Sequence, residues 1–297
     1  MELPMRYLGL SGRILKRPDL QAPNQQQLSQ WVLYLYDVLR YLEQQQIHCY
    51  RLPAWPYELL NTWPEAAEQF QLIGNYAQQA QIRLTYHAPS NVLLNSHDPL
   101  IRQYALTYLT SAAAYLINLG CDDPVIVVHI GAQYGDRASA LAQSVTSLQQ
   151  LEPAVINVLA LEADGRVWSL LDALHIHAQT SIPVIFDWLH HQLYNPAQLN
   201  DTEALNYALA TWPVQRKPKV HFSSPRTEIR LGQRQQLLLP TWHEHSDLAN
   251  PFELISLLRL PYQREYDLML EVKAGDLAIE RARNDLQRFA PEISDVE

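Results

Sequence analysis

Histidine and carboxylate side chains recur at the ends of short apolar runs in this sequence. The run PVIFD (183–187) ends at Asp187 and is followed by His190 and His191. Other runs end at or beside a residue of the same kind, namely His87, His129, Glu162, His221 and Glu271. Imidazole and carboxylate ligands without cysteine suit Mn, Zn, Co or Fe. The residue types therefore predict a divalent-metal centre.

The number of these residues indicates more than one ion. A single histidine beside an apolar run is more often a hydrogen-bonded core residue than a ligand. Several ionisable groups at the same relative position of successive strands would be costly to bury together without a compensating charge. A single ion would leave most of them unused, whereas two or three ions at the spacing of phosphodiester-cleaving centres would employ them.

Two further features extend the predicted centre. The segment HEHSD (243–247) supplies His243 and His245, unless it is a plain polar surface turn. Lys219 lies two residues before His221 on a predicted strand and so shares its face. An ammonium group beside cations is unfavourable. Lys219 must therefore be neutral, carry a carboxylate adduct or face a phosphate.

The hydrophobic pattern predicts the elements that position these residues. Short runs rich in β-branched and aromatic residues predict eight strands, at 5–11, 48–52, 82–87, 125–130, 157–162, 183–187, 219–223 and 268–272. The segments between them, such as 28–45 and 65–80, place apolar residues at helical spacing.

This alternation predicts an α/β fold, a (β/α)8 TIM barrel, whose C-terminal strand ends build the active site. We expect a single domain over residues 1–290 and a frayed tail over 291–297. A doubly wound open sheet is the alternative. It would call for a glycine-rich phosphate loop after an early strand, and LSGR (10–13) is too slight to count.

Composition limits the partners. The net charge of −9 argues against attraction of nucleic acid to the whole surface, because phosphate contacts need clustered Lys and Arg. The segment 216–234 is a local exception, with six basic residues against the single acid Glu228, and is either a DNA-facing patch or a solvated loop and helix face. No signal peptide or membrane span is expected. We expect a cytoplasmic monomer without membrane contact.

Taken in order, the motifs resemble those of the UV damage endonucleases, a family of barrel repair enzymes. The similar segments are HIGAQYGDR (129–137), LEAD (161–164), IPVIFDWLHH (182–191), KVHFS (219–223), HSD (245–247) and LMLEVK (268–273). Each motif alone is weak, whereas their order and spacing over nearly the whole chain are specific.

By position, the resemblance implies up to three divalent ions, expected to be Mn²⁺, with Zn²⁺ or Co²⁺ as alternatives. The implied ligands are His87, His129, Glu162, Asp187, His190, His221, His245 and Glu271. Glu162 and Glu271 would bridge ions, and Asp187 and Lys219 would complete the catalytic set, with Lys219 open to carboxylation. His191 and His243 match the family less closely, and we assign them a supporting role.

The implied reaction is hydrolysis of the phosphodiester immediately 5′ of a UV photoproduct in damaged double-stranded DNA, with association with the nucleoid while the enzyme acts. The segment 216–234 would clamp the DNA backbone. The residues expected to contact DNA are Tyr7, Ser90, Asn91, Gln133, Tyr134, Arg226 and Arg230.

The chain departs from the family pattern where the lesion would be tested. Within HAPSN (87–91), Ser90 and Asn91 stand where the family commonly places a glutamine and an aromatic residue. Ala163 and Ser11 stand where it tends to have asparagines. The predicted ligand set is therefore complete, while the predicted lesion-testing surface is altered.

Two other functions are compatible with these residues. A xylose isomerase-like sugar isomerase or epimerase also uses Glu, Asp and His at barrel strand ends, although it needs fewer metals and a small closed pocket. A relative that retains the metals and binds DNA or a partner without cutting is the other alternative. The complete ligand set disfavours it, because an idle site would be free to lose ligands.

Overall fold

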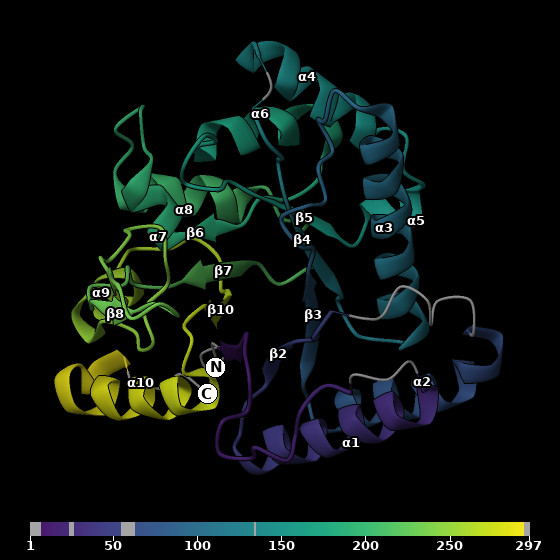
Figure 1. The fold of residues 1–297 in the computed structure, drawn as a ribbon, viewed down its shortest axis with the longest axis vertical. Coiled ribbons are helices and arrows are strands. Elements are labelled where there is room, and N and C mark those ends of the chain that lie inside the picture. The colour runs from purple at the N-terminus through teal and green to yellow at the C-terminus, as the bar shows by residue number, and fades with distance from the viewer. Residues whose placement is uncertain (1–6, 24–26, 55–62, 134, 294–297) are drawn as a thin grey trace.

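A ring of parallel strands forms the centre of the molecule. The computed structural model describes residues 7–23, 27–54, 63–133 and 135–293. Eight parallel strands form one sheet in the order β5-β4-β3-β2-β1-β10-β7-β6. Leu161 of β5 forms a parallel bridge with Val184, just before β6, so the two edges of the sheet meet. Figure 1 shows the helices around the outside of the strands. The predicted (β/α)8 barrel is confirmed.

The elements alternate along the chain as predicted. The sheet strands are β1 (Leu8–Leu10), β2 (Cys49–Arg51), β3 (Arg83–His87), β4 (Val125–His129), β5 (Leu159–Glu162), β6 (Phe186–Asp187), β7 (Lys219–Phe222) and β10 (Asp267–Leu270). The helices are α1 (Leu28–Gln44), α2 (Trp63–Gln79), α3 (Pro99–Asn118), α4 (Arg137–Leu148), α5 (Pro153–Ile156), α6 (Leu170–Thr180), α7 (Trp188–Leu193), α8 (Asp201–Ala210), α9 (Pro251–Leu258) and α10 (Gly275–Phe289).

Local sequence explains several of these boundaries. Every residue of β4 up to its last is buried, as expected for a parallel strand covered on both faces. The α3 helix begins where the Asp98 carboxylate accepts from the Leu100 N–H, with Pro99 in the first turn. The α6 helix begins with a reciprocal capping box between Ser169 and Asp172. Both helices are therefore started by their own side chains.

Two segments differ from the prediction. The C-terminal end of the basic segment forms β8 (Arg230–Leu231), which pairs with β9 (Leu237–Leu238) in an antiparallel hairpin. The sequence had left a DNA-facing patch and a solvated loop and helix face as the alternatives. The expected frayed tail begins with an ordered 3-10 turn over Pro291–Ile293, whose Glu292 pairs with Arg259. Residues 294–297 lie outside the described residues.

In the described part of the chain, no helix combines the length and the apolar character that crossing a membrane requires.

Candidate metal centre

The C-terminal strand ends bring the predicted ligands to one mouth of the barrel. His87, His129, Glu162 and Asp187 are the last residues of β3, β4, β5 and β6. Strand register places His129 beside Glu162 and Asp187 beside His221. Since all strands are parallel, these side chains share one end of the sheet. The barrel therefore gathers residues that are far apart in sequence.

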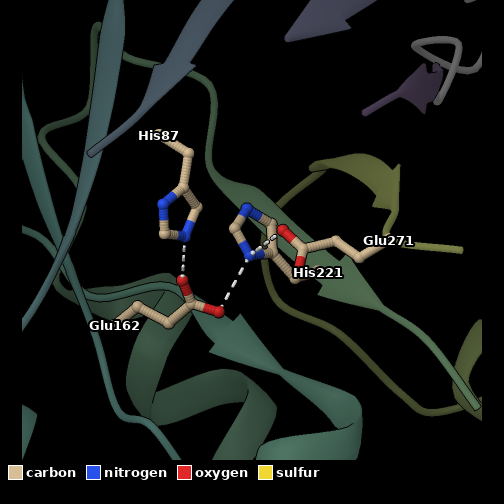
Figure 2. A group of neighbouring side chains, drawn as sticks. All are labelled: His87, Glu162, His221 and Glu271. Carbon is tan, nitrogen blue, oxygen red and sulfur yellow. Dashed lines mark hydrogen bonds and ion pairs between the residues drawn. The ribbon is translucent and has the colours of Figure 1, made fainter. Parts of the chain in front are cut away.

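One group of potential ligands surrounds Glu162 on its β3 and β7 side. Its members are His87, Glu162, His221 and Glu271, which offer ligand atoms within 4.8 Å of one another. Figure 2 shows the two imidazoles facing the carboxylates. His87 Nε2 lies 2.8 Å from Glu162 Oε2, and His221 Nδ1 lies 3.0 Å from Glu162 Oε1. His221 Nδ1 also lies 3.0 Å from Glu271 Oε1.

A second group shares Glu162 and extends towards β6. It comprises Glu162, Asp187 and His190, again within 4.8 Å. His190 Nδ1 lies 3.4 Å from Glu162 Oε1 and 3.6 Å from Asp187 Oδ1. The His190 backbone N–H donates to Asp187 Oδ1 at 2.7 Å, which starts α7 and fixes the histidine at the mouth. Glu162 therefore lies between two sets of donors.

The remaining predicted ligands flank these groups. His129 Nε2 lies 3.9 Å from Glu162 Oε2, and its ring centroid is 5.1 Å from that of His87. His245 Nδ1 lies 3.9 Å from Glu271 Oε2. The structure thus places the other six predicted ligands around Glu162 and Glu271.

The ionisable groups of this cluster perturb one another strongly. Burial favours the neutral form of Glu162, but the His221 and His129 imidazoles hold its pKa well below its ordinary value. Burial raises the pKa of Asp187 to about 8, and the nearby Glu162 charge adds to the shift. Burial also lowers the pKa of His221 to about 4, which favours the neutral imidazole needed for metal binding.

The donor set fits divalent cations. Asp187 Oδ2, His129 Nδ1 and His190 Nδ1 are buried and have no hydrogen-bond partner among the described residues. Buried polar atoms are normally satisfied, so unpartnered donors and acceptors on residues of this cluster are consistent with a missing positive partner. The nitrogen and oxygen donors match Mn²⁺, Zn²⁺ or Co²⁺ and do not identify one of them.

Lys219 is fully buried at the start of β7. Its Nζ donates to Thr85 Oγ1 at 3.1 Å, and within the described ranges no carboxylate lies at ion-pair distance. Burial, together with the charge of Arg51, lowers the pKa of Lys219 to about 7. The side chain thus lies inside the barrel, as its register with His221 predicted, and has no anionic partner among the described residues.

Arg51 is a residue of this site that sequence reasoning left without a role. It ends β2, forms an ion pair with Glu271, and its Nη2 lies 3.4 Å from His221 Nε2. Arg51 ends its strand at the same relative position as the predicted ligands, and this position was the signal that the sequence offered. Arg51 and Glu271 line a cavity of about 460 Å³ at the mouth, together with Ser11, Ser90, His87, His129, His190 and His245.

The two residues assigned a supporting role lie beside the centre. His191 is buried, with its ring 5.4 Å from that of Phe186 and its Nε2 3.6 Å from Asp201 Oδ1. His243 is half-buried, and burial, with the charge of Arg166, lowers its pKa. Neither residue belongs to the two ligand groups among the described residues.

Several of the predicted DNA contacts lie on segments that follow the C-terminal ends of β3, β4 and β7. Ser90 and Asn91 are exposed after β3, and Ser90 lines the cavity. Gln133 is exposed after β4, whereas Tyr134 lies outside the described residues. Arg230 is half-buried and pairs with Asp247 at 2.9 Å and Glu228 at 3.2 Å.

Two predicted DNA contacts do not fit the structure. Tyr7 precedes β1 at the opposite end of the barrel, where its ring lies against His48 and Lys217. Arg226 is only 3% exposed, because its guanidinium donates to the Glu228 and Leu239 carbonyls. Neither side chain is presented to a duplex at the mouth.

The basic segment 216–234 is also not one continuous patch. Arg216 binds Asp123 at 2.9 Å and the Pro124 carbonyl, at the N-terminal end of β4. Lys217 pairs with Asp267 at 2.5 Å, at the N-terminal end of β10. These residues precede β7, whereas Arg230 and Arg234 follow it, so the strand carries the two halves to opposite ends of the barrel.

Comparison with known proteins gives a family and a fold. A family model described as UV-endonuclease UvdE matches residues 19–296. A UV DNA damage endonuclease of Bacillus cereus (strain B4264) is 27% identical over 209 residues, covering 70% of this chain and 63% of that protein. The chain thus spans somewhat under two thirds of the length of this relative.

Two solved structures share the architecture. The crystal structure of SacUVDE has a TM-score of 0.78 at 21% identity, over 95% of this chain and 98% of that chain. The crystal structure of 3-keto-D-glucoside 4-epimerase, YcjR, from E. coli has a TM-score of 0.59 at 12% identity, over 95% and 98%. Because a sugar epimerase also has this barrel, these likenesses concern the fold alone.

Proposed function

This chain belongs to the UV-endonuclease UvdE family, and from that membership we propose that it is a metal-dependent DNA repair endonuclease. We propose that it hydrolyses the phosphodiester immediately 5′ of UV photoproducts in duplex DNA. The observation that carries the proposal is the position of Glu162, which belongs to both groups of potential ligands. A carboxylate shared in this way suits a bridge between cations, as phosphodiester hydrolysis by clustered metals requires.

The residues at the mouth hold the cluster and orient the substrate. Divalent ions, when bound there, lower the pKa of an attacking water and neutralise charge on the phosphate. Glu162 and Glu271 are the proposed bridging carboxylates, because each presents its two oxygens to different imidazoles. Asp187 holds the His190 backbone through one oxygen and leaves the other oxygen for a cation. We favour Mn²⁺ from the family resemblance.

Lys219 is proposed to be carboxylated on Nζ. The support is its complete burial without a carboxylate partner. A buried ammonium is costly, and formation of an N–C bond between the neutral amine and CO₂, with release of a proton to solvent, would convert it into an anionic carbamate ligand. That product would contribute one more carboxylate ligand for the divalent ions when they are bound.

The rim is proposed to contact the DNA through Ser90, Asn91, Gln133 and Arg230. A cavity of about 460 Å³ is within the range of pockets that bind small ligands and suits a lesion turned out of the duplex. Ser90 and Asn91 are too small to replace a stacked base. We therefore expect weaker discrimination between damaged and intact DNA than a bulkier rim would give.

A plasmid-nicking assay tests the proposed reaction. Supercoiled plasmid, either UV-irradiated or untreated, is incubated with the protein and Mn²⁺, with Glu162→Gln as control. We expect nicking of irradiated plasmid by the wild type and at least about a thousandfold less by the variant, which loses the shared ligand. Equal nicking of irradiated and untreated plasmid would contradict the proposed lesion specificity. If the wild type nicks neither plasmid faster than Glu162→Gln does, the proposed nuclease function is wrong.

The position of the cut is tested on an end-labelled duplex with one photoproduct. Cleavage immediately 5′ of the lesion should give a single labelled product. That product should be extended by a DNA polymerase, since the proposed reaction leaves a 3′-hydroxyl. A product that cannot be extended would contradict the proposed chemistry.

A further inference from the structure

Arg51 lines the cavity of the metal centre without being one of its ligands. Its side chain is 16% exposed and forms an ion pair with Glu271. Its Nε atom is buried and has no hydrogen-bond partner in the described part of the chain. A guanidinium carries five N–H donors in a fixed fork, so part of its binding capacity remains unused.

The ring of His221 connects Arg51 to the carboxylates. Figure 2 shows this ring between Glu162 and Glu271, with Nδ1 3.0 Å from an oxygen of each. A neutral imidazole has one donor and one acceptor nitrogen. When Nδ1 carries the proton and donates to a carboxylate, Nε2 is free to accept from Arg51 Nη2 at 3.4 Å. In this arrangement Arg51 supplies positive charge to a cluster of anions.

A cation held through His221 Nδ1 would change this arrangement. Metal ligation uses the lone pair of that nitrogen, so the ring proton must lie on Nε2. Two N–H groups would then face each other, and Arg51 would lose His221 as an acceptor. Glu271 would at the same time share its charge with the cation. Both contacts that hold Arg51 are weakened by the same event.

We propose that Arg51 binds a non-bridging oxygen of the substrate phosphodiester when the centre is loaded, and replaces the missing positive charge when it is not. The inference rests on the proposed function and assigns a further residue to it. A guanidinium fork matches the oxygens of a phosphate. Among the described residues that line the cavity, Glu271 is the only acid, so a phosphate competes with one lining carboxylate for Arg51.

The test compares two synthetic linkages immediately 5′ of a defined photoproduct. In one linkage a methylene group replaces the 3′-oxygen, which keeps the phosphate charge but cannot be cleaved. The other also carries a methyl group in place of one non-bridging oxygen, which removes the charge. Equilibrium binding of both duplexes to Mn²⁺-loaded wild type, Arg51→Gln and Arg51→Lys is measured by fluorescence anisotropy.

The pattern of affinities decides the proposal. The wild type should bind the uncharged linkage at least about tenfold more weakly, as expected for a charge-assisted contact. The difference in affinity between the two duplexes should be at least several-fold smaller in Arg51→Gln, where only the bound ions still favour the charged linkage, and Arg51→Lys should recover part of it. If the uncharged linkage lowers the affinity by the same factor in wild type and in Arg51→Gln, the proposed role of Arg51 is wrong. If wild type nicks ordinary irradiated DNA in that case, the proposed function survives. If it neither nicks nor binds, both proposals fall.

Metal affinity provides a readout that does not depend on DNA. Arg51→Gln should bind Mn²⁺ at least as tightly as the wild type, because the ion pair that competes for Glu271 is gone. Weaker Mn²⁺ binding would show that Arg51 assembles the ligands, which would contradict the proposal. The thermal unfolding of the same samples reports whether each variant is folded.

Discussion

His190 and His191 are adjacent in the sequence but lie in different surroundings. His190 lies 3.4 Å from Glu162, within the second group of potential ligands. His191 is buried between Phe186 and Asn195, away from both groups. The short α7 helix rotates consecutive side chains by about 100°. One imidazole therefore faces the centre, and its neighbour supports the loop.

This difference predicts opposite effects of two matched substitutions. His190→Ala should lower the bound Mn²⁺ per chain and reduce nicking, because it removes a ligand. His191→Ala should leave the metal content unchanged and lower the free energy of unfolding by about 2 kcal/mol, because it removes a buried ring. Metal analysis and denaturant unfolding measure the two effects. Equal metal loss in both variants would contradict the assignment.

Lys219 allows a second prediction at this scale. Lys219→Arg keeps a positive charge but cannot form the carboxylate adduct. We expect it to bind less Mn²⁺ and to nick at least about tenfold more slowly. In ¹³C-bicarbonate buffer, the wild type should show an additional carbonyl resonance by NMR that the variant lacks. A variant with wild-type metal content and rate would exclude carboxylation as part of the site.

At the scale of elements, the loop between β5 and α6 is built to hold α7 in place. Asp164 Oδ1 accepts the backbone N–H groups of residues 166, 167 and 168 at 3.0, 2.9 and 2.8 Å. Gly165 has a φ of +65°, and a Cβ there would lie 2.6 Å from His190 Cα. Because the nearest atom belongs to the His190 backbone, no side chain can move to make room for an added Cβ. The absence of a side chain at Gly165 thus lets the proposed ligand His190, on α7, take its position.

Gly165→Ala should therefore affect metal binding as well as stability. Gly120→Ala is the matched control, because Gly120 has a φ of +68° but nothing within 4 Å of its added Cβ. Each variant should lose about 1 kcal/mol from backbone strain. Only Gly165→Ala should lose further stability and bound Mn²⁺. Metal analysis and unfolding curves measure the two effects. Equal Mn²⁺ content and equal stability of the two variants would refute the prediction.

The β8–β9 hairpin depends on a buried cation. Arg226 is linked to Glu244 at 2.6 Å in addition to its two carbonyl acceptors, and Pro225 bridges to His245. The side chain thus ties the hairpin to the segment that carries a proposed ligand. A sequence pattern of basic residues does not distinguish this role from a phosphate contact.

Arg226→Met should accordingly destabilise the protein by about 2 kcal/mol, because it leaves buried carbonyls unsatisfied. It should leave the salt dependence of DNA binding unchanged. Arg230→Ala should lower the slope of log affinity against log salt by about 1, as expected for one phosphate contact. Exposed Arg234→Ala serves as the stability control. A reduced salt slope in Arg226→Met would restore the original assignment to DNA contact.

At the scale of the whole molecule, the barrel buries several carboxylates at one end, where their mutual repulsion is unfavourable. Glu162, Asp187 and Glu271 are all buried at the mouth with imidazoles around them. The opposite end satisfies its charges internally, since Asp267 pairs with Arg83 at 2.9 Å and with Lys217. Within the described residues, the mouth is therefore the end whose buried carboxylates bound cations would stabilise.

Metal binding should stabilise the folded protein. A ligand present at a hundred times its dissociation constant adds about 2.7 kcal/mol, since it binds only the native state. We expect the melting temperature to rise by about 5 °C in Mn²⁺ relative to EDTA, and much less in Glu162→Gln. Differential scanning calorimetry measures the shift. Identical melting in Mn²⁺ and EDTA would count against the proposed centre.

The sequence by itself determined the strands, their order along the chain and the residues at their ends. Apolar runs such as 125–130 and 219–223 are local patterns, and parallel strands then require His129 and His221 to share one edge. The fold and the gathering of the ligands therefore followed from periodicity and motif order. Strand boundaries shifted by a few residues, because hydrogen bonding, not composition, ends a strand.

Tertiary structure alone decided which charged residues are free and which end of the barrel they occupy. From the sequence, Arg226 is expected to be an exposed cation, and only the structure shows that carbonyl groups bind it. Tyr7 was expected to contact DNA, and only the structure shows that it lies before β1, at the end of the barrel away from the mouth. Arg51 gains a role only because the closed barrel places β2 across from Glu271 and His221. These facts depend on contacts between distant segments, and no local pattern records such contacts.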